Sequence, residues 1–162
     1  MMHPLKISIV QTDIAWENKQ ENLRMLREKL HALRGTTEIV VLPEMFSTGF
    51  TMKSRELAEP VSGITVRILK ELAADFQLAL CGSFICSERS NYYNRAFFIT
   101  PEGEEFYYDK RHLFRMGNEA EYFSSGNNKL IISYRDWSLT VCVVNGRLSN
   151  STLFDTVFAP YL

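Results

Sequence analysis

The chain has 162 residues, 46% hydrophobic and 23% charged, which is the composition of an ordinary globular protein with one domain and a substantial buried core. The formal net charge of −1 argues against a nucleic-acid-binding protein, because such proteins normally carry a basic stripe. The sequence contains no apolar run of membrane-spanning length, and its three cysteines do not suit a disulfide framework, so we expect a reduced, cytoplasmic setting.

The first part of the chain alternates predicted strands and helices. Residues 6–11 alternate in polarity and are β-branched, which predicts a strand. Leucines recur at spacings of three and four within residues 18–33, so an amphipathic helix is expected there, ended by Gly35. The apolar run 38–42 predicts a strand that is covered on both faces, and Glu44 lies just past its end.

The rest of the chain continues this pattern and then becomes antiparallel. A second helix, a third apolar strand and two hairpins are predicted at residues 63–76, 78–84, 95–108 and 130–144, with a loop over 110–128. A βαβαβ order followed by antiparallel strands is typical of an α/β layered architecture.

Glu44 is the first candidate for a chemical role. It follows a buried strand, at the carboxyl end where open α/β sheets bind their ligands. A carboxylate held among the neighbouring apolar side chains could act as a general base. The alternative is a solvated loop glutamate, and a motif this short does not decide between the two.

Lys110 is the second candidate. It comes at the end of an apolar hairpin strand, before the predicted loop, where its ammonium could stabilise a developing oxyanion. The alternative is a lysine at a strand end that extends its charge into water.

Taken together, these segments resemble a known family. Pro-Glu-Met-Phe at 43–46 and Tyr-Asp-Lys-Arg-His-Leu-Phe at 108–114 are similar to the first two signatures of the nitrilase, or carbon–nitrogen hydrolase, superfamily. The details of 46–50 and 112–116 look most like its omega-amidase branch. The resemblance covers about residues 5–137.

The resemblance implies a fold and a set of roles. The fold is the N-terminal part of an αββα sandwich. Glu44 would be the general base, Lys110 would stabilise the oxyanion, and Glu119 matches a supporting glutamate of the family, with an exposed loop residue as its alternative interpretation. A cysteine would attack a small amide that bears a carboxylate, ammonia would leave, and water would release the acid. No metal, organic cofactor, nucleic acid or membrane is implied, and the family suggests a homo-oligomer.

The nucleophile is the weakest part of the match. Cys142 lies near the expected place but about two residues early, which is about 6.6 Å along a strand. Its neighbours also differ from the family's Cys-Tyr-Asp motif, so a small buried strand residue remains the alternative interpretation. Cys81 and Cys86 are interpreted as a core residue and a loop residue.

The length of the chain gives a second departure from the family. We expect residues 1–162 to form a single incomplete carbon–nitrogen hydrolase domain, with 5–137 similar to the family and 138–162 divergent. We hypothesise that the reading frame is truncated or altered after about Trp137. Translation of the encoding DNA in its other two frames would test this. The alternative to an omega-amidase is therefore an inactive remnant or a self-associating half-domain, because an uncovered sheet face favours pairing.

Overall fold

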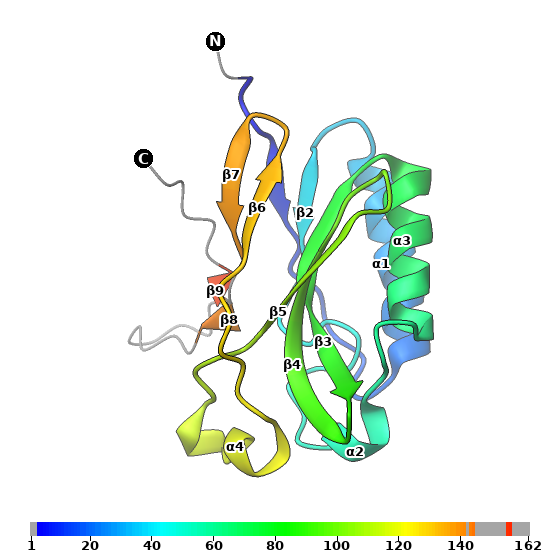
Figure 1. Ribbon diagram of the computed structural model, residues 1–162. Helices are drawn as coiled ribbons and strands as arrows, with labels where there is room; N and C mark the ends of the chain where they lie inside the picture. Colours follow the sequence, from blue (N-terminus) through cyan, green and yellow to red (C-terminus); the bar gives the residue numbers. More distant parts are fainter. Residues whose placement is uncertain (1–2, 142, 145–154, 157–162) are drawn as a thin grey trace.

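One five-stranded sheet forms the centre of the computed structural model, which describes residues 3–141, 143–144 and 155–156 (Figure 1). Its strands, in spatial order, are β1 (Ile7–Ile9), β2 (Ile39–Val41), β3 (Ala79–Glu88), β4 (Asn91–Ile99) and β5 (Glu105–Asp109). The pairs β1–β2 and β2–β3 are parallel, whereas β3–β4 and β4–β5 are antiparallel. The parallel strands are joined through helices, as parallel connections require.

Two helices, α1 (Lys19–Leu33) and α3 (Ile64–Phe76), cover one face of this sheet (Figure 1). The Asn18 side chain caps α1 by accepting a hydrogen bond from the Glu21 amide. The apolar stripes of both helices, spaced at three and four residues, are buried in a single cluster with the sheet. This core confirms the two predicted helices to within a residue at each end.

A hairpin of β6 (Ile131–Tyr134) and β7 (Trp137–Thr140) lies on the opposite face (Figure 1). Its inward side chains share a second buried cluster with the main sheet, in which the rings of Phe98 and Tyr134 are 5.2 Å apart and edge to face. β2 is buried at all three positions because it lies between these two layers. The order helix, sheet, sheet confirms the predicted α/β fold.

The structure corrects several details of the predicted elements. The expected loop over 110–128 contains two short helices, η1 (Arg115–Gly117) and α4 (Glu119–Tyr122). The expected strand over 137–144 is divided into β7 and β8 (Val143–Val144), and β8 pairs with β9 (Asp155–Thr156). A short helix that the sequence pattern did not predict, α2 (Ser54–Leu57), follows the turn after β2.

The third predicted strand is longer than expected, and Cys86 therefore lies in β3 rather than in a loop. β3 and β4 are connected by only two residues, Arg89 and Ser90, whose φ angles of 48° and 70° are both positive. A turn with two positive φ angles matches the twist of the two strands that it connects. In sequences, such a turn is normally recognised by asparagine or glycine at these positions. Without that signal, the hairpin could not be recognised in the sequence.

None of the helices within the described ranges is long and apolar enough to cross a membrane.

Candidate active site

A tight turn directly after β2 positions Glu44. Met45 adopts a left-handed conformation with φ 47°, and its amide donates to the Ser83 side-chain oxygen on β3 at 2.9 Å. The Gly49 amide closes the turn by donating to the Met45 carbonyl oxygen at 2.8 Å. Because Met45 is fully buried, the turn has one fixed place at the end of the sheet, and this fixes the position of Glu44 beside it.

Ser83→Ala tests how much this turn depends on its side-chain contact. The substitution leaves the buried Met45 amide without its acceptor, so we expect the free energy of unfolding to fall by about 1–3 kcal/mol. Urea denaturation measures the change, with the exposed Ser62→Ala as a control that should remain within about 0.5 kcal/mol of the parent. Equal stability of the two variants would contradict the proposed importance of the contact.

Lys110 immediately follows β5 and is held at its backbone on both sides. Its amide donates to the Asn94 carbonyl oxygen at 2.9 Å, and its own carbonyl oxygen accepts from the Gly126 amide at 3.0 Å. A side chain at Gly126 would collide with the Asp109 carbonyl oxygen. The Lys110 side chain is only 1% exposed, so the interpretation of a strand-end lysine that extends into water is wrong.

Glu119 begins α4 and is fully buried. Its Oε2 accepts from the Phe114 amide at 2.6 Å and lies 3.0 Å from Lys110 Nζ. The alternative interpretation of Glu119 as an exposed loop residue is therefore wrong.

The structure brings together the three charged residues singled out in the sequence. Lys110 Nζ lies 2.8 Å from Glu44 Oε1, although the two residues are 66 positions apart, and the same ammonium contacts Glu119. One ammonium thus faces two carboxylates, and the ring of Phe50 lies 5.3 Å from Nζ. Glu44, with its side chain 20% exposed, is the member of this group that solvent can reach. We call Glu44, Lys110 and Glu119 the charged triad.

Asn94, on β4, is a further polar residue at this place, and no role was predicted for it. It is fully buried, and its side-chain nitrogen donates to Glu44 at 2.5 Å and to Glu119 at 3.4 Å. The available signal in the sequence was an asparagine in the middle of a strand, two residues before its apolar second half, because a buried polar group requires partners.

The predicted nucleophile, Cys142, lies outside the described residues. Both other cysteines are buried on β3. Burial raises the pKa of the Cys86 thiol to about 11, which keeps it protonated near neutral pH and unsuited to nucleophilic attack. Within the described residues, no group of three or more histidine, cysteine and acidic side chains could hold a metal ion.

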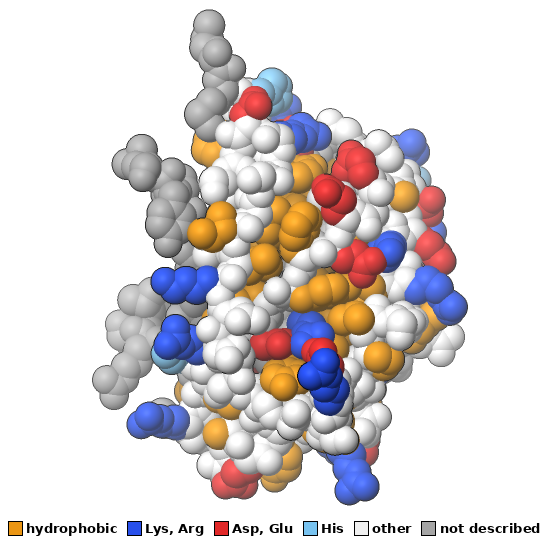
Figure 2. Space-filling view, viewed as in Figure 1, with side chains coloured by type: hydrophobic (Ala, Val, Ile, Leu, Met, Phe, Trp, Pro, Cys, Tyr) orange, Lys and Arg blue, Asp and Glu red, His pale blue; other side chains and the backbone are white. Residues whose placement is uncertain are grey.

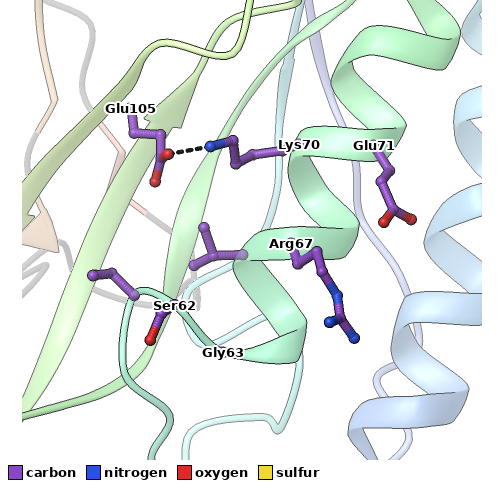
Figure 3. A pocket seen from close by; sticks show the side chains of 8 residues that line it. Ser62, Gly63, Arg67, Lys70, Glu71 and Glu105 are labelled. Carbon is purple, nitrogen blue, oxygen red and sulfur yellow. Dashed lines mark hydrogen bonds and ion pairs between the residues drawn. The ribbon is translucent and has the colours of Figure 1, made fainter.

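A hollow of about 520 Å³ lies elsewhere, between the start of α3 and β5 (Figure 3). Lys70 on its wall forms an ion pair with Glu105, and the carboxylate of Glu59 already caps the start of α3 at the Thr65 amide. None of the charged triad lines this hollow. A smaller hollow of about 240 Å³ adjoins Arg95, which forms two hydrogen bonds with Asp109. Neither hollow is the candidate active site.

Comparison with known proteins gives a consistent result. The carbon–nitrogen hydrolase family matches residues 6–156. The chain is 32% identical to the omega-amidase YafV of Escherichia coli K12 over 138 residues, which are 85% of this chain and 53% of that protein. It is 27% identical to an (R)-stereoselective amidase of a Pseudomonas species, covering 81% of this chain and 48% of that protein.

Solved structures agree with this assignment. XC1258 of Xanthomonas campestris, a protein of the carbon–nitrogen hydrolase superfamily, superimposes with a TM-score of 0.85 at 35% identity, covering 88% of this chain and 54% of that one. Nit3 of Saccharomyces cerevisiae, of the nitrilase superfamily, gives 0.70 at 25% identity, with 79% and 51% covered. The chain therefore spans about half the length of the relatives it matches. With its sequence match and its fold in agreement, this chain belongs to the carbon–nitrogen hydrolase family.

Proposed function

We propose that this protein hydrolyses small amides that also bear a carboxylate, in the manner of an omega-amidase. The observation that supports this most strongly is the charged triad, in which an acid that solvent can reach and a buried ammonium lie 2.8 Å apart at the end of the sheet. The similarity to YafV, a protein named as an omega-amidase, supports the substrate class.

In the proposed reaction, Glu44 takes the proton of the Cys142 thiol, and the thiolate attacks the amide carbon. The carbonyl π electrons move to oxygen, and Lys110 stabilises the resulting oxyanion. An ammonium has three donors, and two of those of Lys110 are directed to the carboxylates, so one can serve the substrate oxygen. As the C–N bond breaks, Glu44 returns the proton to the leaving ammonia.

The resulting thioester is then hydrolysed. Glu44 accepts a proton from water, and the resulting hydroxide attacks the acyl carbon. As the C–S bond breaks, Glu44 returns this proton to the leaving thiolate, which gives the acid and the Cys142 thiol. Amide and water are consumed, and one acid and one ammonia are formed. Glu119 takes no proton in this scheme and holds Lys110 in place.

The test is ammonia release from the omega-amide of a 2-oxo dicarboxylic acid, with acid quenching and peptide mass spectrometry to find the acyl group. We expect the acyl mass on the Cys142 peptide and loss of turnover in Cys142→Ala. Cys86 is an internal control, because its raised pKa of about 11 predicts no acylation. Unchanged turnover in Cys142→Ala would exclude that residue as the nucleophile.

A second candidate function is a non-catalytic half-domain that self-associates. The observation in its favour is a set of apolar side chains exposed on β1, an edge strand, and on β6, namely Ile7, Ile9 and Ile131. Hydrophobic side chains are also visible along the centre of the face drawn in Figure 2. Sedimentation at several concentrations tests it: association without ammonia release favours the half-domain, and a monomer with turnover excludes it.

A further inference from the structure

The side chain of Asn94 contacts both carboxylates of the charged triad. Its single nitrogen, Nδ2, donates to Glu44 Oε1 at 2.5 Å and to Glu119 Oε1 at 3.4 Å, which uses both of its hydrogens. The backbone of the same residue accepts the Lys110 amide at 2.9 Å. Asn94 therefore contacts every member of the triad.

The orientation of this amide follows from its surroundings. Exchanging Nδ2 and Oδ1 would place a carbonyl oxygen against two carboxylate oxygens, where only a donor fits. Oδ1 is buried and has no hydrogen-bond partner within the part of the chain that the structure describes. Burying an amide with one end unpaired is unfavourable, so packing alone does not account for asparagine here.

The contacts also select one oxygen of Glu44. Asn94 Nδ2 and Lys110 Nζ both bind Oε1, at 2.5 Å and 2.8 Å. Two donors on one oxygen fix the carboxylate in a single orientation and leave Oε2 to meet an incoming proton. Because the amide is neutral, it fixes Glu44 without a second positive charge, which would weaken the carboxylate as a base.

We propose that Asn94 is a positioning residue that ties Glu44 to Glu119 and presents Glu44 Oε2 as the proton acceptor. This inference rests on the proposed amide hydrolysis, for which Glu44 is the base. Its role is distinct from that of Lys110, because Asn94 supplies orientation and no charge.

The first test compares two variants that remove buried polar groups. Asn94→Leu removes both donors and keeps the branched shape of the side chain. Thr37→Val is the control, because Thr37 is also buried, and its hydroxyl bonds the backbone of Lys6 and Ile39 at the start of β2, at the other end of that strand from Glu44. We expect kcat for the omega-amide to fall on the order of 10²-fold in Asn94→Leu, as for a base displaced by about 1 Å, with KM nearly unchanged.

The folded fraction of each variant, measured by circular dichroism, separates positioning from a general loss of structure. When kcat is calculated per folded molecule, an unfolded fraction cannot lower it. Thr37→Val should then keep the parent kcat. A loss of kcat per folded molecule in Asn94→Leu no larger than that in Thr37→Val would overturn the proposal.

A second measurement does not depend on turnover or on the folding of Asn94→Leu. With ¹⁵N-labelled asparagine, the Asn94 side-chain NH₂ signals should shift in Glu44→Gln and in Glu119→Gln. Those of Asn22 should not, because this buried side chain bonds the backbone of Ala15 and Ser47 and no carboxylate. If the parent protein hydrolyses no omega-amide, the proposed function fails, and these signals alone decide whether Asn94 bridges the two carboxylates. Signals that move in neither variant would show that the bridge does not exist.

Discussion

Glu44→Gln is expected to lower kcat for the omega-amide by about 10²- to 10⁴-fold, the usual contribution of a general base. Glutamine has the size of glutamate but cannot accept the proton of the nucleophile or return it to ammonia. Substrate binding requires no proton transfer, so KM should change little. Ammonia release under saturating substrate measures the effect.

The control for this prediction is Glu56→Gln, which changes an exposed glutamate of α2. It should keep the parent kcat and the parent melting temperature. Turnover of Glu44→Gln within about threefold of the parent would remove Glu44 from the proposed mechanism, since a base contributes at least about 10²-fold.

Lys110→Met should be the most destabilising single change at this site. The ammonium is 1% exposed and contacts both Glu44 and Glu119, so its removal leaves a fully buried carboxylate without its cation. Loss of one partner from such a pair costs about 3–5 kcal/mol. Urea denaturation measures the free energy of unfolding, and the proposed amide hydrolysis should disappear, because Lys110 is its proposed oxyanion donor.

Two further variants make this expectation specific. Lys53→Met breaks an ion pair with Glu17 in which the lysine is 60% exposed, and pairs of this kind contribute about 1 kcal/mol or less. Lys110→Met/Glu119→Gln should recover part of the lost stability, because it also removes the uncompensated charge. A double variant no more stable than Lys110→Met would show that the loss has another cause, such as a cavity left by the shorter side chain.

The main elements of the fold were predictable because their apolar periodicity is regular and their ends are marked. Helix α1, for example, repeats leucines at spacings of three and four, is buried along that stripe, and begins after the capping residue Asn18. The β3–β4 turn was not predictable, since Arg89 and Ser90 adopt positive φ angles without the usual residue types. Local patterns describe local conformation well, and this turn is set by the long pairing of the two strands beside it.

Predicting the site depended on contacts between distant parts of the chain. Glu44 and Lys110 each had an ordinary alternative interpretation in the sequence. Only the fold shows that they meet at the end of the sheet, where the ammonium of Lys110 neutralises the charge of the Glu44 carboxylate. Asn94 carried even less local signal, because a buried amide becomes informative only when its partners are known. The resemblance to the family motifs identified the two charged residues in spite of their weak local signal. It suggested no role for Asn94.

The order in which the charged triad appears along the chain has a consequence for synthesis. Glu44, Asn94, Lys110 and Glu119 all leave the ribosome before position 142, where the proposed nucleophile lies. Domains generally fold as units. The charged groups are therefore all available to pair with one another when the domain folds, and the proposed nucleophile is the last of these groups to leave the ribosome.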